Sequence, residues 1–151
     1  MYSWIVKQVL GALLGRLNAG DIRPVLWTYA PDARLVFPGR SSFAGDHRGK
    51  GEIEAWLRRF VGLGPTFMLH DVAVAGFPWN MRVLFRFSDR IPIPGGGEYA
   101  NEGMEYLRLR RGRIAEQYVY LDTEAVADLD ARLGVQTPIL KASPPRGSTP
   151  L

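Results

Sequence analysis

Cysteine is absent from this chain, histidine occurs twice, and no apolar run approaches the length of a membrane span. The lack of cysteine excludes disulfides and thiolate chemistry, and two scattered histidines give no spacing typical of a metal site. A membrane-spanning helix needs about 18–20 apolar residues, so we expect none. Because Lys7 interrupts the apolar N-terminal stretch and Arg16 follows it, we expect no signal peptide and a cytoplasmic protein that binds no membrane.

The positive charge of the chain is scattered. The 151 residues carry a net charge of +4, but the arginines follow no single helix or stripe, as a nucleic-acid partner would require. One cluster surrounds Gly112, and we interpret it as a solvated hairpin tip in preference to a phosphate-binding patch. The run Gly95-Gly96-Gly97 lacks the strand–helix context of a nucleotide-binding loop. We therefore expect no nucleic acid and no cofactor.

Hydrophobic periodicity predicts helices in the first part of the chain and strands in the second. Helices are expected over residues 3–18, 21–27, 51–61 and 122–133, and strands over 33–37, 67–75, 81–87, 98–110 and 114–121, with a polar loop over 40–50. Helices gathered on one face of a largely antiparallel sheet make an α+β fold. We expect one domain over residues 1–135 and a Pro/Ser/Gly-rich arm over 136–151.

Several short segments carry a resemblance to a known superfamily. They are Leu17-Asn18-Ala19-Gly20-Asp21, Tyr29-Ala30-Pro31-Asp32-Ala33, Val36-Phe37-Pro38-Gly39, Gly76-Phe77-Pro78-Trp79-Asn80, Tyr99-Ala100-Asn101-Glu102-Gly103, Gly112-Arg113-Ile114-Ala115-Glu116 and Tyr120-Leu121-Asp122-Thr123. In this order they resemble the nuclear transport factor 2-like superfamily, and within it a SnoaL-like bacterial subgroup with polyketide cyclase-like and limonene epoxide hydrolase-like members. The resemblance implies a cone-shaped, curved, mostly antiparallel sheet with three N-terminal helices, a cystatin-like α+β barrel. It also implies one small-molecule pocket and a homodimer formed through the sheet.

The known chemistries of the superfamily match this chain only in part. Ketosteroid isomerases use a Tyr and a carboxylate base at positions that fall near Leu13 and at Phe37, which are apolar here. Their third group, a protonated acid on a later strand, has a counterpart in Glu105. Limonene-type epoxide hydrolases imply a role for Arg86, but one of their two aspartate positions falls on Ser88.

The second aspartate position of the epoxide hydrolases falls near Val119. SnoaL-type cyclases use a His/Asp pair, for which the chain offers His47, His70 and Asp122, without a residue-by-residue match. The resemblance therefore implies a pocket and leaves its chemistry open.

Glu105 is the leading candidate for chemistry. Period-two alternation places it on one strand face with Tyr99 and Asn101, and the resemblance turns this face toward the cone. Burial of a carboxyl in an apolar cavity raises its pKa, which would suit a general acid or base. Pairing of Glu105 with Arg82 or Arg86 across the strands is the structural alternative.

We predict Glu105, His70 and Arg86 as catalytic residues, with His47 as a weaker candidate. The predicted substrate-binding residues are polar or aromatic side chains and one aliphatic one: Asn101, Tyr99, Trp27, Phe37, Trp56, Gln117 and Val119. The predicted function is cofactor-free acid–base cyclisation, isomerisation or epoxide opening on a small, apolar, oxygen-bearing molecule. The alternative is a non-catalytic domain that binds a small ligand or mediates dimerisation.

Overall fold

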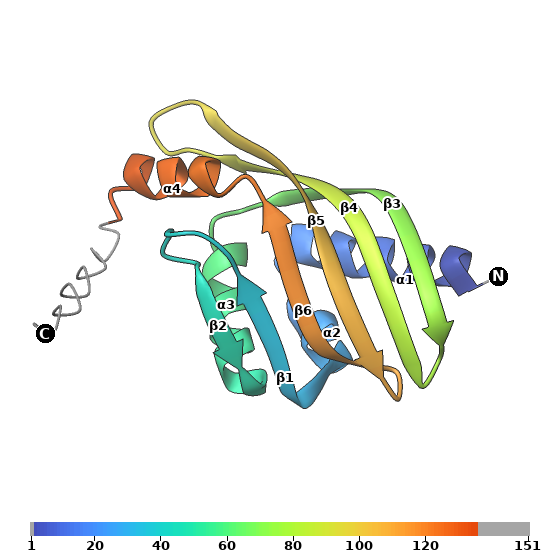
Figure 1. Cartoon of the computed structure of the whole chain (residues 1–151). Helices are drawn as coiled ribbons and strands as arrows, with labels where there is room; N and C mark the ends of the chain where they lie inside the picture. The colour runs from blue at the N-terminus through green and yellow to red at the C-terminus, as the bar shows by residue number, and fades with distance from the viewer. Residues whose placement is uncertain (1, 136–151) are drawn as a thin grey trace, which may run out of the picture.

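The computed structural model describes residues 2–135; the arm expected over residues 136–151 lies outside them. Helices and strands follow one another in the predicted order, with one additional strand (Figure 1). The elements are α1 Tyr2–Asn18, α2 Arg23–Thr28, β1 Tyr29–Phe37, β2 Gly45–Arg48, α3 Gly49–Val61, β3 Thr66–Phe77, β4 Asn80–Pro92, β5 Glu98–Arg110, β6 Arg113–Leu121 and α4 Thr123–Arg132.

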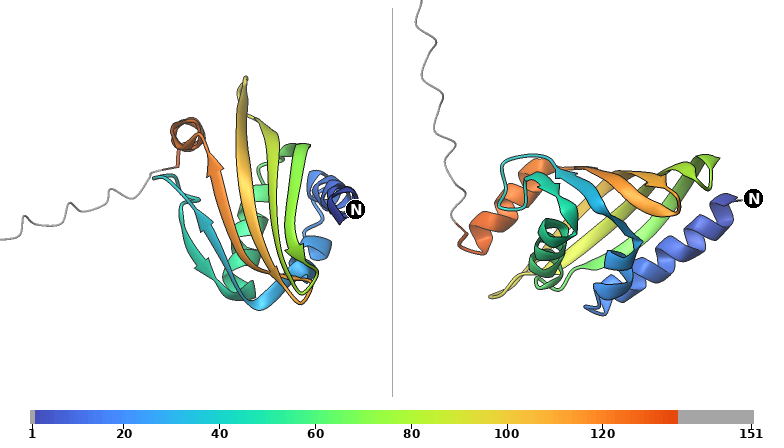
Figure 2. Two further views of the ribbon diagram at one scale, coloured as in Figure 1. Left: turned by 45° about the vertical axis from the view of Figure 1, so that its right-hand side comes forward. Right: turned by 90° about the horizontal axis from the view of Figure 1, so that it is seen from below.

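The six strands form one curved sheet that does not close on itself (Figure 2). Their order is β2-β1-β6-β5-β4-β3, and the last four strands of the chain form an antiparallel meander. β1 pairs with β2 in antiparallel and with β6 in parallel orientation. The predicted α+β fold with a curved, mostly antiparallel sheet is confirmed.

The helices cover one face of this sheet. In Figure 1 the sheet lies in front of α1, α2 and α3, and the views in Figure 2 show these helices on its concave side. α1 packs along β3, and the Asn18 side chain at its end bonds both backbone groups of Phe67, with distances of 2.7 and 3.0 Å. α3 presents Ile53, Trp56 and Phe60 to the core because they recur at helical spacing. The concave face is therefore enclosed by the helices.

Two helix starts show how local sequence directs the chain. Asp122 is the N-cap of α4, and its Oδ1 accepts hydrogen bonds from the backbone N–H groups of Glu124 and Ala125. At α2 the cap position is Ile22, which has no side-chain hydrogen bond, but Oδ1 of the preceding Asp21 accepts one from the backbone N–H of Arg23 at 3.2 Å. Asp21 also forms an ion pair with the Arg23 side chain.

The alternation of β4 separates the two sheet faces most clearly. From Met81 to Ile91 every second side chain is buried, and the side chains between them are exposed except for the half-buried Ser88. The strand continues to Pro92, five residues beyond the predicted end at Phe87. This extension brings an acidic residue, Asp89, onto the inner face.

Residues 45–48 form a strand where a loop was predicted. β2 has the sequence GDHR, which lacks both apolar alternation and β-branched residues, so no local signal marked it. It is fixed by its neighbour instead, since Asp46 receives two hydrogen bonds from Arg34 of β1, at 2.8 and 2.9 Å. None of the helices within residues 2–135 has both the length and the apolar character required to cross a membrane.

Candidate active site

A cavity of about 80 Å³ lies between the concave face of the sheet and helices α1, α2 and α3. That is several times the space that one water needs. Its wall is largely apolar, and includes Leu10, Leu13, Leu14 and Leu17 of α1, Trp56, Leu57 and Phe60 of α3, and Phe37, Phe85, Phe87, Leu107, Val119 and Leu121 of the sheet. Three residues predicted to bind substrate, Phe37, Trp56 and Val119, thus lie in this wall.

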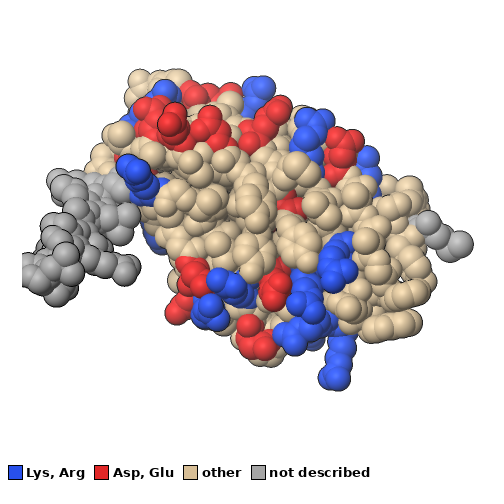
Figure 3. Space-filling model, in the orientation of Figure 1, with Lys and Arg blue, Asp and Glu red and all other residues tan. Residues whose placement is uncertain are grey.

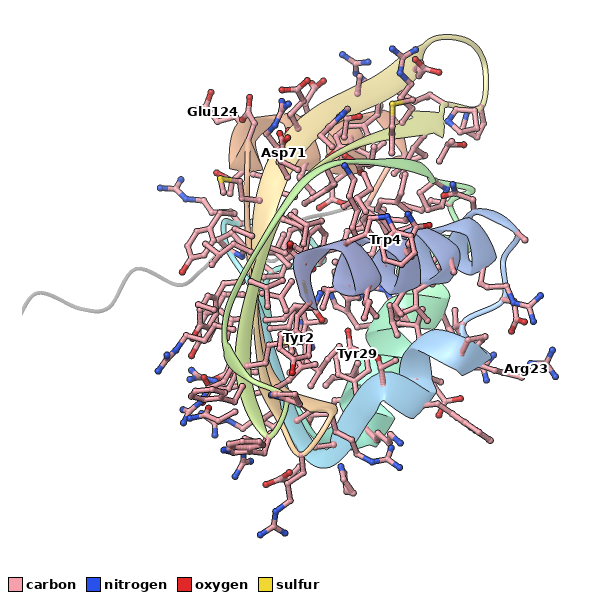
Figure 4. All side chains as sticks on the ribbon, turned by 90° about the vertical axis from the view of Figure 1, so that its right-hand side faces the viewer. Tyr2, Trp4, Arg23, Tyr29, Asp71 and Glu124 are labelled. Atoms are coloured by element: carbon pink, nitrogen blue, oxygen red, sulfur yellow. The ribbon has the colours of Figure 1, made fainter. Side chains whose placement is uncertain are left out.

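Three polar side chains form a hydrogen-bonded chain within the apolar wall. Gln117 of β6 donates from Nε2 to Oε2 of Glu105 at 2.6 Å, because residues 105 and 117 lie near each other on neighbouring strands. The amide oxygen of the same Gln117 accepts a hydrogen bond from the hydroxyl of Tyr29, at the start of β1. In Figure 4, Tyr29 lies between the sheet and the helices. The Tyr29 hydroxyl fixes the amide orientation that directs Nε2 toward Glu105.

The environment of Glu105 favours its neutral form. Burial raises the pKa of the Glu105 carboxyl to about 7; the hydrogen bond from Gln117 partly offsets this, and the nearby Asp89 raises it further. Glu105 retains some accessible surface, which borders the cavity. Burial also raises the pKa of the Tyr29 hydroxyl, with a smaller contribution from Glu105, so Tyr29 stays a donor. The alternative pairing of Glu105 with an arginine is wrong, since Gln117 is its partner.

Asp89 is a second carboxyl in the wall of the cavity. Its side chain is 1% exposed, and neither of its oxygens has a hydrogen-bond partner among the described residues. Burial raises the pKa of Asp89 to about 7. The N–H of Asp89 itself offsets part of this shift, although its geometry is too poor for a normal hydrogen bond to the carboxyl. Neither Asp89 nor Tyr29 was predicted from the sequence as a site residue. For Asp89 the signal was available, because the alternation of Phe85 and Phe87 continues to residue 89.

Tyr99 and Asn101 share a face with Glu105, as predicted, but they do not line the cavity. The Asn101 amide donates to the Tyr99 hydroxyl at 2.8 Å and to the backbone carbonyl of Asp122 at 2.9 Å, and its oxygen accepts from the backbone of Glu102. These bonds join β5 to the start of α4. Burial raises the pKa of Tyr99, and Asp89 adds to the shift. The polar groups of Asn101 are thus bonded within the protein. The prediction that Asn101 binds substrate in the cavity is therefore wrong.

Three further predicted site residues lie away from the cavity. Arg86 faces outward between Phe85 and Phe87, and its Nε donates to Asp71 at 3.0 Å. His70 also faces outward, with Nε2 2.9 Å from the hydroxyl of Ser88. The expected contribution of Arg86 and His70 to one site with Glu105 is therefore wrong in this fold.

Trp27 and His47 complete the predicted residues. Trp27 is 80% exposed at the end of α2, so the expectation that it forms a pocket wall is wrong. A helix of six residues is too short for its periodicity to fix which face is buried. His47 lies on β2, with Nε2 3.4 Å from the carbonyl oxygen of Phe43, and it does not line the cavity.

The sequence of residues 10–117 matches the model of the SnoaL-like domain, so the chain belongs to this family. An NTF2-like protein from Burkholderia pseudomallei is similar in structure, with 18% identity, a TM-score of 0.69, and coverage of 83% of this chain and 94% of that one. TerC, which was co-crystallised with polyporic acid, has 18% identity, a TM-score of 0.69, and coverage of 81% and 95%.

SalBIII is also similar in structure, with 13% identity, a TM-score of 0.64, and coverage of 79% of this chain and 92% of its own. It is an epoxide hydrolase/cyclase-like enzyme with a role in pyran ring formation in the polyether salinomycin. At these identities the likenesses establish the fold and not the activity. No curated protein matches the chain in sequence.

The site combines an apolar wall with two buried carboxyls and no facing cation. A carboxyl with a pKa near 7 can accept a proton and return it at neutral pH. Within the part of the chain that the structure describes, no three His, Asp or Glu side chains gather as ligands for a metal ion. The groups present are therefore suited to proton transfer on a molecule that the apolar wall holds.

Proposed function

We propose that this protein is a cofactor-free enzyme that transfers protons on a small, largely apolar, oxygen-bearing molecule. Glu105 is the general acid–base group, and Gln117 and Tyr29 are its positioning residues. The observation that carries the proposal is the Glu105 carboxyl in an apolar cavity, bonded to Gln117 through one oxygen only. The reaction classes that this group serves are isomerisation, cyclisation and epoxide opening.

The two oxygens of Glu105 have different roles in this proposal. Oε2 accepts the Gln117 hydrogen bond, which fixes the plane of the carboxyl group. Oε1 accepts no hydrogen bond from a residue in the range 2–135, so it is left for the substrate. In an isomerisation, Oε1 would take a proton from carbon beside a carbonyl group and return it to another carbon, so that no proton is gained or lost overall.

The wall defines the substrate class. Among residues 2–135, no Lys or Arg side chain lines the cavity, so an anionic substrate would meet two carboxyls without a compensating cation. A molecule with an apolar skeleton and no negative charge fits these surroundings. TerC with polyporic acid and SalBIII with its role in pyran ring formation show that similar folds are associated with oxygen-bearing molecules, which supports an oxygen-bearing molecule here.

The test uses two kinds of probe, a β,γ-unsaturated cyclic ketone and a small cyclic epoxide. Ketone isomerisation is followed by the absorbance of the conjugated product, and epoxide opening by chromatography. We expect turnover of at least one probe, and Glu105→Gln should lower kcat about 100- to 10,000-fold, as loss of a general acid–base group does. Glu102→Gln, on the outer face of the same strand, is the matched control and should keep the wild-type rate.

The outcomes of this test separate catalysis from binding. If both probes bind, but their conversion never exceeds the rate in buffer, the domain is a non-catalytic ligand-binding module. If turnover persists in Glu105→Gln at the wild-type rate, Glu105 is not the acid–base group. Circular dichroism of each variant shows that any loss of turnover arises in a folded protein.

A homodimer through the outer face of the sheet is the assembly that we propose. The middle of this face is largely uncharged, with charges of both signs around it (Figure 3). The apolar side chains exposed on it include Leu84 at 38%, Met104 at 46% and Tyr120 at 60%. Light scattering should give twice the mass of the chain, and Met104→Lys should give a monomer. A wild-type monomer would contradict the proposal.

The remaining predictions concern location and other partners. A cytoplasmic location stays a prediction, which cell fractionation tests. The absence of nucleic-acid binding also stays a prediction, which a mobility-shift measurement at low salt tests.

A further inference from the structure

Asp89 is a buried polar group that the proposed proton transfer does not use. It lies on β4, on the same face as Phe85 and Phe87, and it lines the same cavity as Glu105. In the strand register Phe85 lies opposite Glu105, so Asp89 lies four residues farther along β4. At about 3.3 Å per residue this is roughly 13 Å along the strand between the α-carbons of Phe85 and Asp89. The cavity thus has two acidic positions with apolar surface between them.

The surroundings of Asp89 supply no partner from within the described residues. Both carboxyl oxygens lack hydrogen-bond donors, although the side chain is 99% buried. Asn101 lies opposite Asp89 on β5, but its amide NH₂ donates to the Tyr99 hydroxyl and the Asp122 carbonyl instead. Arg90, the next residue in the chain, faces outward and pairs with Glu98 at 3.3 Å. Buried polar groups without partners are rare, and each calls for an explanation.

Two explanations of Asp89 as a purely structural group do not fit the contacts. A structural carboxyl typically caps a helix or binds backbone N–H groups, as Asp130 does when it accepts hydrogen bonds from the backbone and hydroxyl of Ser42. A structural ion pair would place an Arg or Lys within reach, as Asp46 has Arg34. Asp89 has neither arrangement; it lines the cavity and also an open hollow that Asn101 and Asp122 share.

We propose that Asp89 is a second binding position of the cavity, and that it accepts a hydrogen bond from an O–H or N–H group of the ligand. The ligand is then an alcohol or a protonated amine with an apolar skeleton between this group and the part that faces Glu105. This inference deepens the proposed function and rests on it only in taking the cavity as the ligand site. A hydrogen-bond donor at this position supplies the partner that the protein does not.

Phe87 lies on β4 between Asp89 and Phe85, the residue opposite Glu105 of β5. It faces Gly103 of β5, where an added Cβ would lie 3.1 Å from the ring and 2.8 Å from Cβ of Leu121. The glycine therefore leaves space that the aromatic ring occupies. Phe87 and its neighbours form an apolar surface along the path from Glu105 to Asp89, which suits the skeleton of the ligand and not a second polar group.

The experiment measures binding of three matched probes by calorimetry at pH 8. Cyclohexylmethanol and cyclohexylmethylamine each carry a donor, and cyclohexyl methyl ether is an isomer of the alcohol without one. We expect the alcohol and the amine to bind wild-type protein at least about ten-fold more tightly than the ether, the factor expected for a hydrogen bond to a charged acceptor. Asp89→Leu, of similar size, should abolish this preference.

Further variants locate the effect and identify the donor. Asp89→Asn should weaken binding of the amine more than binding of the alcohol. The amide oxygen still accepts a hydrogen bond, but it carries no negative charge to pair with the ammonium group. Glu105→Gln should still bind the alcohol and the amine more tightly than the ether. Because this measurement needs no turnover, it tests the role of Asp89 even if the proposed catalysis fails. Equal binding of the three probes by wild-type protein, no binding of any at millimolar concentration, or loss of the preference in Glu105→Gln would overturn the proposal.

Discussion

On the outer face of the sheet, Asp46 accepts hydrogen bonds from both Arg34 and Arg48, and the first of these arginines holds the pKa of the carboxyl below its usual value. On the inner face, Glu105 and Asp89 are surrounded by apolar side chains, and burial raises the pKa of each to about 7. The same functional group is thus held in its charged form on one face and driven toward its neutral form on the other.

The contrast comes from alternation along the strands. A shift of one residue exchanges a solvated position with arginine neighbours for a desolvated position beside the cavity. Glu102 and Glu105 illustrate this on β5, since Glu102 lies 4.0 Å from Arg86 on the outer face, whereas Glu105 bonds a neutral amide inside. The inner carboxyls are suited to proton transfer because the fold gives them no cation.

The largest expected effect concerns stability against pH. Because folding raises the Glu105 pKa from 4.5 to about 7, the folded state binds more protons than the unfolded state between these values. The free energy of unfolding should therefore fall as pH rises from about 4.5 to 7, and stay level above that range. With 1.36 kcal/mol for each unit, Glu105 contributes a fall of about 3 kcal/mol. Glu105→Gln should lose this part of the slope in urea denaturation.

Asp46→Asn should change the pH dependence of the unfolding free energy in the opposite direction. The pKa of Asp46 is lowered by its hydrogen bond with Arg34, so its contribution to stability is present above the unfolded pKa and is lost as pH falls. The variant should therefore be less sensitive to acid than the wild type below about pH 4. If Glu105→Gln and Asp46→Asn changed the pH profile in the same direction, the contrast between the two faces would be wrong.

A smaller effect is expected from adding a methyl group at Gly103. An added Cβ would lie 2.6 Å from the backbone oxygen of Tyr120, so the neighbouring strand or Phe87 must shift. Gly103→Ala should destabilise the protein by about 1–3 kcal/mol, as overpacking of a core does. Gly51→Ala is the control, because nothing lies within 4 Å of its added Cβ in α3. Thermal unfolding should show no loss in the control; equal losses would contradict the account of the inner face.

Removal of the Gln117 hydrogen bond should shift the Glu105 pKa upward. Gln117 is the group that lowers this pKa, and Gln117→Met keeps its length without a donor. A hydrogen bond to a charged group contributes about 1.5–3 kcal/mol, so the pKa should rise by about one to two units. The midpoint of a pH–rate profile or an NMR titration reports the shift. A midpoint that does not move would show that Gln117 does not control the protonation of Glu105.

The smallest effect is expected on the outer face. Arg86→Ala removes an exposed ion pair with Asp71, and such pairs contribute less than about 1 kcal/mol. Denaturation should show a change within this limit, and the affinity for cyclohexylmethanol should equal that of the wild type. A weakened affinity would restore Arg86 to the site, contrary to its outward position.

The fold was largely predictable because its long elements repeat a clear period. The α+β order, the meander and the inward face of Glu105 follow from alternation and from the resemblance to the superfamily. β2 escaped prediction because its polar sequence is a strand only through pairing with β1. Tertiary pairing of this kind leaves no local pattern.

The site was predictable to a lesser degree. Glu105, Gln117 and the apolar wall were found, since each lies on a strand with clear alternation. Asp89 was missed because the predicted strand stopped at residue 87, although the alternation of β4 continues past residue 89. Arg86 was assigned by resemblance against its own alternation, which turns it outward, and Trp27 lies on a helix too short to define a face.

The most direct test is the carboxyl pKa of Glu105, from a carbon-detected NMR titration of protein labelled at glutamate, with Glu105→Gln to assign the signal. A midpoint near 7 would confirm that the inner face holds a desolvated carboxyl poised for proton transfer at neutral pH. A midpoint at or below the ordinary value of 4.5 would mean a solvated or ion-paired carboxylate, and would contradict both the contrast between the faces and the proposed role of Glu105.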